Sequence, residues 1–207
     1  AHDLRSPMAS MKMLLNTIMM SVEKDKIDPD IFDMLEMSNK TSEEVFSLLD
    51  NLLKWTKSQL GKLTVIPQKL DISGLADGVV EVMNSVAEVK HIKLIRTDHE
   101  SFFVYVDIEM IKSILRNLIS NAVKFSNPDS EIKVGIKAED GKVIVSVTDS
   151  GKGIKKEDQH KLLKDSTHFT TYGTNSEEGS GLGLLLCRDF ARKNGGELWF
   201  ESEENLG

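Results

Sequence analysis

Asp149-Ser150-Gly151-Lys152-Gly153-Ile154 and Gly179-Ser180-Gly181-Leu182-Gly183-Leu184 are the two glycine-rich stretches that decide the fold of this chain. An alternating apolar run, 143–147, precedes the first stretch and predicts a strand, and the apolar residues after the second stretch predict a helix. A glycine-rich turn at the start of a helix lets backbone N–H groups approach a phosphate closely. One such cluster also occurs in ordinary tight turns. Two clusters joined by a polar segment predict a nucleotide site under a lid.

The bulk composition narrows the class of protein. Hydrophobic residues make up 40% and charged residues 29% of the chain, which is normal for a soluble globular protein. The net charge of -7 gives no electrostatic support for binding nucleic acid. The single cysteine, Cys187, leaves no disulfide within the chain and predicts a buried structural thiol. No apolar run has the length of a membrane span, and the N-terminus lacks a signal-peptide pattern, so we expect a soluble chain in a reducing compartment.

The first sixty residues carry two apolar seams with alternating steps of four and three, which is typical of helices that pack side by side. Asp28-Pro29 predicts the start of the second helix, and Gly61 predicts its end. The two helices form an antiparallel hairpin, and pairing with a second copy into a four-helix bundle would bury both seams. The alternative is a hairpin that packs on its own C-terminal domain. The first seam contains Leu4, Met8, Met11, Leu15, Ile18 and Val22, and the second Met34, Ser38, Thr41, Val45, Leu48, Leu52, Trp55 and Gln59.

The rest of the chain alternates strand and helix patterns. Strands are expected at 62–70, 92–96, 102–106, 132–137, 143–148 and 197–202, and helices at about 71–90, 108–125 and 184–194. Glu139-Asp140-Gly141 predicts a β-hairpin. The fold class is therefore α+β: a helical hairpin, 1–61, followed by an α/β sandwich, 62–207, with one mixed sheet covered by helices on one face.

Two asparagines share one face of the predicted helix 108–125. Asn117 and Asn121 are four residues apart, and Lys124 follows about one turn later. Asparagine is unfavourable in the interior of a helix, so two asparagines on one helix face require an explanation. A carboxamide oxygen suits Mg²⁺, which proteins hold with few side chains plus substrate phosphates. Lys124 could then pair with phosphate. A solvated polar stripe is the alternative.

The N-terminal heptapeptide Ala1-His2-Asp3-Leu4-Arg5-Ser6-Pro7 is a second candidate for chemistry. Asp3 could hydrogen-bond one imidazole nitrogen of His2, fix its tautomer and make the other nitrogen more nucleophilic. Pro7 removes one helical hydrogen bond and permits a kink. By itself, a His-Asp pair at a chain terminus is more often a solvated surface pair.

Together these stretches resemble the sensor histidine kinases of two-component signalling over essentially the whole chain. The heptapeptide is similar to the family's phosphoacceptor box, and residues 117–125 to its asparagine box. The two glycine-rich stretches resemble the first and second glycine boxes. Thr170-Thr171-Tyr172-Gly173-Thr174-Asn175-Ser176-Glu177 is similar to the ATP lid. The four boxes occur in the family's order, and the lid segment lies between the two glycine boxes.

The resemblance implies ATP and Mg²⁺ as cofactors and His2 as the residue phosphorylated from ATP, with Asp3 as general base. Asn121 would hold Mg²⁺, Lys124 would contact phosphate, and Asp149 would bind the adenine amino group. The remaining nucleotide-binding residues implied are Asn117, Phe125, Gly151, Gly153, Thr171, Gly173, Thr174, Gly179, Ser180, Gly181, Leu182 and Gly183.

The same nucleotide fold occurs in gyrase-type and chaperone ATPases, which carry a glutamate one helical turn before the metal-binding asparagine. Asn117 occupies that position here and cannot act as a base, which favours phosphotransfer over hydrolysis. The alternatives are a dimerising scaffold without activity and an ATPase of the same fold. Glu178, at a lid position that is often basic, and the missing phenylalanine box leave room for the scaffold.

The resemblance also implies partners and a location. The expected partners are the receiver domain of a response regulator and a second copy bound through the helical hairpin, with no nucleic acid. We expect the chain to be cytoplasmic and its hairpin to be N-terminally truncated, since the family's first helix begins upstream of His2. Any membrane contact, such as an anchor of the parent protein in the inner membrane, would then come only from segments before Ala1.

Overall fold

The computed structural model of the protein describes residues 2–23, 26–98, 100–162, 172–174, 177 and 181–207. The chain divides into two compact units, one up to Leu63 and one from Thr64 onward. Gly61, the predicted end of the helical hairpin, has a φ of +64°, a conformation that suits glycine and ends the second helix.

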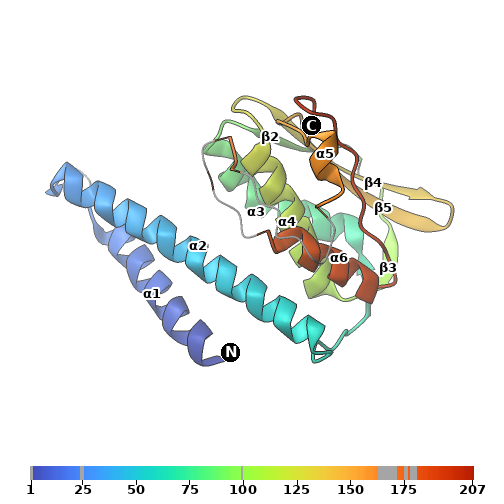
Figure 1. The fold of residues 1–207 in the computed structure, drawn as a ribbon, viewed down its shortest axis with the longest axis horizontal. Helices are drawn as coiled ribbons and strands as arrows, with labels where there is room; N and C mark the ends of the chain where they lie inside the picture. Colours follow the sequence, from blue (N-terminus) through green and yellow to red (C-terminus); the bar gives the residue numbers. More distant parts are fainter. Residues whose placement is uncertain (1, 24–25, 99, 163–171, 175–176, 178–180) are drawn as a thin grey trace. The chain divides into compact units, whose positions relative to one another are not determined.

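The first unit is a helical hairpin of α1 (His2–Ser21) and α2 (Pro29–Gln59), which lie side by side (Figure 1). Asp28 caps α2 as predicted, because its carboxylate accepts a 2.9 Å hydrogen bond from the N–H of Asp30. Pro29 fills the first helical position, where a missing N–H costs nothing. Both predicted helices are confirmed.

A buried and half-buried face of α2 is displaced by one residue from the predicted seam, and two of its residues, Asn39 and Phe46, contact α1. Its residues repeat at steps of four and three, namely Leu35, Asn39, Ser42, Phe46 and Leu49, and all are buried or half-buried. Asn39 donates a 2.9 Å hydrogen bond to Asn16 of α1. The predicted seam instead leaves a row of exposed apolar side chains on α2, made up of Met34, Val45, Leu48 and Leu52.

The second unit contains two sheets, where the sequence predicted one mixed sheet. The mixed sheet has three strands, in which β2 (Lys93–Arg96) pairs parallel with β4 (Glu131–Glu139), and β4 pairs antiparallel with β5 (Lys142–Thr148). β1 (Gln68–Asp71) and β3 (Phe103–Val106) form a separate antiparallel pair. Helix α3 (Ile72–Glu88) packs against α4 (Ile108–Phe125), and α6 (Gly183–Lys193) against α4 (Figure 1).

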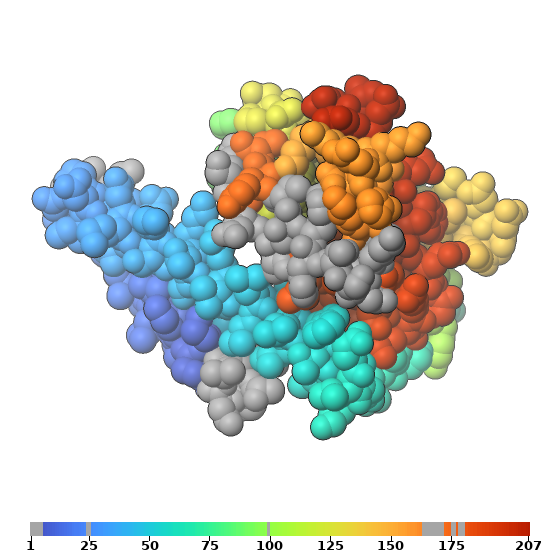
Figure 2. Space-filling model, in the orientation of Figure 1, coloured from blue at the N-terminus to red at the C-terminus, as the bar shows by residue number. Residues whose placement is uncertain are grey.

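The hairpin between β4 and β5 confirms the signal at Asp140-Gly141. Both residues have positive φ, +51° and +74°, as a two-residue turn of the favoured hairpin type requires. The pairing begins at once, with Glu139 opposite Lys142. Figure 2 shows the tip of this hairpin, in gold, projecting from the surface of the second unit.

Two strand predictions differ from the structure. The strand expected at 62–70 begins only at Gln68, because Pro67 cannot donate a ladder hydrogen bond. The strand expected at 197–202 is wrong, since the structure describes no strand there. Ser202 makes other hydrogen bonds instead of strand pairing. Its carbonyl accepts from the side chain of Gln159 in α5 (Lys156–Gln159), and its hydroxyl donates to the carbonyl oxygen of Gly207. Alternation of apolar residues does not make a strand without a partner for the backbone.

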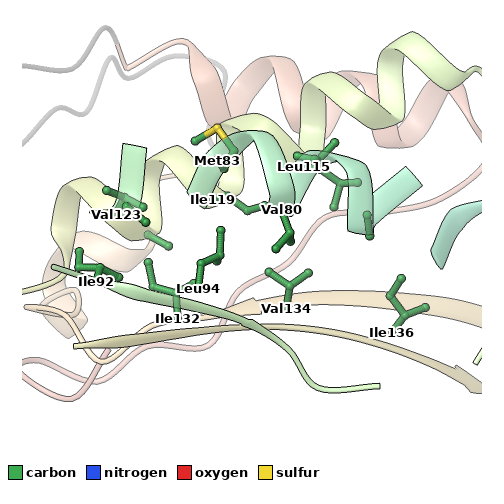
Figure 3. Packing of buried hydrophobic residues seen from close by; sticks show 14 of the residues in the cluster. Val80, Met83, Ile92, Leu94, Leu115, Ile119, Val123, Ile132, Val134 and Ile136 are labelled. Atoms are coloured by element: carbon green, nitrogen blue, oxygen red, sulfur yellow. The ribbon is translucent and has the colours of Figure 1, made fainter. Parts of the chain in front are cut away.

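The core of the second unit lies between the helices and the mixed sheet. Val80 and Met83 of α3 and Leu115, Ile119 and Val123 of α4 are the helical members of this core cluster (Figure 3). The sheet side contributes Ile92, Leu94, Ile132, Val134 and Ile136 (Figure 3). Alternate residues of β4 are buried, as expected for a sheet with one covered face.

Asp107 fixes the start of α4. Its carboxylate caps the helix by accepting from the N–H of Met110 at 3.0 Å, and it accepts a second hydrogen bond from the N–H of Ile66 at 2.9 Å. Its own N–H donates to the carboxamide of Asn194 at the end of α6. One buried residue, through its carboxylate and its backbone N–H, thus sets the relative position of the segment before β1, α4 and the end of α6.

Cys187 is buried on α6, as predicted. Burial raises the pKa of its thiol to about 12, so the thiolate is not formed at neutral pH. None of the helices in the described part of the chain has the length and apolar character needed to cross a membrane.

Replacing Ile132 by Ala should destabilise the second unit by about 2–5 kcal/mol, because this side chain is fully buried on β4 and its removal leaves a cavity. Ile66→Ala is the matched control, since Ile66 is 60% exposed. Urea unfolding followed by Trp199 fluorescence, with Trp55 of α2 replaced by Phe in every protein, reports on the second unit alone. Equal effects of the two substitutions would contradict this description of the core.

Candidate functional site

The C-terminal end of α4 is the point where the candidate site is assembled. The last four carbonyl groups of any α-helix lack partners within the helix. In α4, the carbonyl of Ala122 accepts from Ser126 N–H, and that of Phe125 accepts from Lys152 N–H at 3.2 Å. The carbonyl of Lys124 accepts from Thr174 N–H at 3.1 Å. Two segments distant in sequence are thereby attached to the asparagine-bearing helix.

The first glycine-rich stretch passes directly against this helix end. Gly151 is buried, and a Cβ at this position would overlap the carbonyl oxygen of Phe125. Gly153 has a φ of +57°, and a Cβ there would overlap the carbonyl oxygen of Glu203. Gly151 therefore shapes the site, whereas Gly153 allows the turn and the close approach of the chain at Glu203.

Asp149 lies directly after β5, as the sequence predicts. One oxygen of its carboxylate accepts a 2.9 Å hydrogen bond from the N–H of Gly151. Burial raises the pKa of Asp149 above its ordinary value of 3.8, and the hydrogen bond from Gly151 opposes part of the rise. The second carboxylate oxygen has no hydrogen bond within the described residues, so it can accept one from a ligand.

The two asparagines lie on α4 as predicted, with different local environments. Asn117 donates a 3.0 Å hydrogen bond to the carbonyl of Ser113 one turn earlier, and a Cβ on Gly183 would lie 3.2 Å from its carboxamide oxygen. Within the described part of the chain, no group hydrogen-bonds the Asn121 side chain, which is half-buried. Asn121 is thus the carboxamide left available to a ligand.

Gly173 and Thr174 belong to the segment that binds the end of α4. A Cβ on Gly173 would overlap the Glu177 carboxylate and would lie 2.8 Å from the backbone carbonyl oxygen of Lys124, which cannot move aside as a flexible side chain can, so this close approach requires glycine. The Gly173 N–H donates to the carbonyl of Glu177 at 2.8 Å. The Thr174 hydroxyl donates to the carbonyl of Ser126 at 2.7 Å. These contacts place two predicted lid residues beside Lys124.

Two lysines lie near the ring of Phe125. Nζ of Lys124 is 5.0 Å and Nζ of Lys152 is 4.8 Å from the ring centroid, both within the range of a cation–π interaction. Lys152 also donates to the carbonyl of Tyr172. Burial lowers the pKa of Lys152, and the Glu177 carboxylate opposes this. The site is therefore positively charged where α4 meets the first glycine turn, which suits a polyphosphate.

Lys90 was missed by the sequence analysis. It lies just after α3 and is buried, with only 7% of its side chain exposed, and its ammonium group contacts both α4 and Glu177. A signal was present, because the buried residues Ala76, Val80, Met83 and Ala87 extend at helical spacing to Lys90. A charged residue at the end of a buried helix face indicates that its charge has a specific partner in the fold.

The second glycine-rich stretch is described only from Gly181. Gly181 has a φ of +68°, Leu182 is buried as the N-cap of α6, and Gly183 begins the helix. These residues lead into a helix as predicted. Thr171, Gly179 and Ser180 lie outside the described residues, as do Glu178 and Phe169. His2 and Asp3 belong to α1 in the first unit.

Within the described residues, no group of three or more histidine, cysteine, aspartate or glutamate side chains could hold a metal ion. A site built from such ligands is therefore absent there. Mg²⁺ does not need such a cluster, because it commonly takes one or two protein oxygens and completes its coordination shell with water and phosphate. The Asn121 carboxamide is compatible with that mode.

Comparisons with known proteins show the family and the fold of the chain. Residues 106–207 match the family described as histidine kinase-, DNA gyrase B-, and HSP90-like ATPase. The adaptive-response sensory kinase SasA of Crocosphaera subtropica is 31% identical over 212 residues, which cover all of this chain and 55% of SasA. The chain therefore spans about half the length of this relative.

Solved structures of histidine kinases have the same fold. The catalytic domain of histidine kinase ThkA is 30% identical, with a TM-score of 0.58, over 68% of this chain and 90% of that domain. Full-length ShkA in complex with AMPPNP is 20% identical, with a TM-score of 0.65, over 92% of this chain and 39% of ShkA. The helical region and the mixed sheet of the α+β fold are thus those of histidine kinase structures.

The fold and the glycine-bounded site define an ATP-binding domain of the GHKL type, the class shared by histidine kinases, gyrase and the HSP90 chaperones. The chain belongs to the sensor histidine kinases and forms part of their kinase core.

Gly151→Ala should destabilise the second unit by about 1–3 kcal/mol, because the added methyl group overlaps the Phe125 carbonyl and forces the backbone apart. Gly78→Ala is the matched control. Gly78 lies inside α3 with open space around it, and Ala there should stabilise by about 0.5–1 kcal/mol. Urea midpoints measure both changes. A Gly151→Ala protein as stable as wild type would contradict the close contact.

Asp149→Asn should remove a pH dependence of stability. A raised pKa means that the folded state binds the Asp149 proton more tightly than the unfolded state does, so its contribution is lost as pH rises from below 3.8 through the raised pKa. The unfolding free energy of the Asn variant minus that of wild type should therefore be larger at about pH 7 than at about pH 4. Urea midpoints at both pH values measure this. A difference that is constant or reversed would contradict the assigned burial.

Proposed function

We propose that the chain transfers the γ-phosphoryl group of ATP to His2, from which it passes to an aspartate of a response-regulator receiver domain. One observation carries the proposal: the end of α4 binds both the first glycine turn, through Phe125 and Lys152, and the segment containing Thr174. This arrangement brings the residues with nucleotide-binding chemistry to one place.

The residues present fit ATP. The second oxygen of Asp149 can accept a hydrogen bond from the adenine amino group, and the missing side chain at Gly151 leaves the backbone open to a close approach. Lys124 and Lys152 supply positive charge for the phosphates. The AMPPNP complex of ShkA, which has the same fold, supports an adenine nucleotide as the ligand.

Asn121 would hold Mg²⁺ through its carboxamide oxygen, because within the described residues this group makes no other hydrogen bond. When bound, the ion would neutralise charge on the transferred phosphoryl group. Gly181, Leu182 and Gly183 would shape the turn at the start of α6, together with Thr171, Gly179 and Ser180.

The proposed acceptor is an imidazole nitrogen of His2. A bond forms between this nitrogen and the γ-phosphorus while the bond from phosphorus to the bridging oxygen breaks, and ADP leaves with the electron pair. Asp3 would hold the other ring nitrogen and accept its proton. In the second step the phosphoryl group moves from nitrogen to a receiver-domain carboxylate.

Hydrolysis of ATP is the less favoured function for this chain. A water-activating base would have to be a carboxylate, and Asn117 supplies a carboxamide whose NH₂ group donates to the Ser113 carbonyl. A non-catalytic scaffold is also less favoured. Such a scaffold would not need residues that fit a nucleotide, as Asp149, Asn121 and the glycines do.

Dimerisation through the hairpin is supported by the exposed row of Met34, Val45, Leu48 and Leu52 on α2. Met11 and Ile18 of α1 are also exposed. Apolar residues repeating at helical spacing are stabilised by packing on another helix, and a second copy supplies an identical face. We propose that residues 1–61 form the dimerising phosphoacceptor hairpin and 62–207 the ATP-binding domain, and that both act in the cytoplasm.

His2→Ala should abolish labelling of the protein by γ-labelled ATP and Mg²⁺, because the acceptor nitrogen is gone, while ATP binding persists. Label on wild type should be acid-labile and base-stable, as expected for phosphohistidine. His160→Ala, which alters an exposed histidine after α5, is the control and should label normally. Retained label on His2→Ala would rule out this acceptor.

Asn121→Ala should remove the Mg²⁺-dependent part of ATP affinity in titration calorimetry, because the only proposed protein ligand to the ion is lost. Asn127→Ala, in the exposed turn after α4, should bind ATP like wild type. The same affinity for Asn121→Ala and wild type, in the presence of Mg²⁺, would exclude the metal role of Asn121.

A further inference from the structure

Lys90 is a buried cation that contacts two separate parts of the nucleotide site. Its Nζ lies 3.1 Å from the carbonyl oxygen of Val123 and 3.0 Å from that of Lys124, at the end of α4. It also lies 2.8 Å from the Thr174 hydroxyl and 2.7 Å from the Glu177 carboxylate. An ammonium group has three N–H donors, so these four oxygens use all of them.

The backbone after α3 directs Lys90 inward. The N–H groups of Lys90 and Ile92 both donate to the carbonyl of Ala87, and His91 between them has a φ of +56°. This tight turn closes the helix and leads into β2. Figure 3 shows Ile92 and Val123 at the same end of the core, where Lys90 reaches the backbone of Val123.

Breaking the ion pair of Lys90 and Glu177 should be costly, because the Lys90 side chain is buried. A buried charge is costly unless it is paired and hydrogen-bonded, and removal of one partner leaves the other uncompensated. Three uncharged oxygens surround Lys90, and Glu177 supplies the only negative charge among its described contacts. The electrostatics therefore favour the arrangement in which Glu177 and Thr174 stay at the end of α4.

We propose that Lys90 is a positioning residue of the nucleotide site, which fixes Gly173, Thr174 and Glu177 against the end of α4 before nucleotide binds. This inference rests on the proposed function. Lys90 need not touch ATP. It acts through Thr174, which hydrogen-bonds Lys124 and Ser126, and through Glu177, whose carbonyl accepts from Gly173.

The consequence for binding is entropic. Residues that are already held in place lose little conformational freedom when a ligand arrives, whereas free residues must be ordered at that moment. Loss of the Lys90–Glu177 pair should therefore weaken ATP binding even though the groups proposed to contact ATP are unchanged.

The test uses Lys90→Met, which keeps the length of the side chain but not its charge, together with Glu177→Gln and the double variant. Lys93→Met and Glu88→Gln are matched controls, because both residues are exposed close to Lys90. Two measurements are made on the full chain: hydrogen exchange of the Gly173 and Thr174 amides by NMR without nucleotide, and ATP affinity by titration calorimetry.

Both single variants should exchange these two amides about tenfold faster and bind ATP about tenfold more weakly, because ordering even one residue costs this much in affinity. The Val134 amide in β4 should exchange as in wild type, which distinguishes a local anchor from general loss of stability. The double variant should resemble one single variant, since the two residues act as a pair. The control variants should match wild type.

Unchanged exchange at Gly173 and Thr174 in folded variants would overturn the inference, and so would exchange that rises equally at Val134. If Lys90→Met does not fold, Glu177→Gln decides, because Glu177 is partly exposed. Absence of ATP binding by wild type would instead overturn the proposed function, and the exchange data would still decide whether Lys90 anchors this segment.

Discussion

The free carbonyl groups at the end of α4 are the constraint on which the site depends. Every helix leaves such groups, and their burial without partners is costly. Here the partners come from Lys90, Lys152 and Thr174, which are separated widely in sequence. Satisfying the end of one helix therefore assembles the asparagine helix, the first glycine turn and the segment around Thr174 in one place.

This constraint also explains why small residues are required. Backbone can hydrogen-bond the end of α4 only if it comes very close, and Gly151 and Gly173 are the points of closest approach. Their missing side chains allow the contact, and they also leave main-chain groups open to a ligand. Stability and the proposed nucleotide binding thus place the same demand on these positions, whereas Gly78 on α3 meets no such demand.

Much of the fold follows from local sequence signals. Asp28-Pro29, Asp107 and Asp140-Gly141 each fix a boundary through short-range hydrogen bonding or backbone conformation, and the structure has those boundaries. The glycines, Asp149 and Asn121 could be selected as site residues because their chemistry is visible in the sequence. Lys90 could not be assigned a role, because its partners lie 33 residues or more away in the chain. The strand expected at 197–202 failed for a related reason, since a strand needs a partner that local alternation does not reveal.

We propose that ATP binds where the end of α4 meets the first glycine turn. The most direct test is an amide NMR spectrum of the full chain, recorded with and without AMPPNP and Mg²⁺. The largest shifts should cluster at Asn121–Phe125, Asp149–Gly153 and Tyr172–Thr174. Large shifts confined to other surfaces, such as the outer edge of α3 and β2 around Asn84 and Lys93, would contradict it.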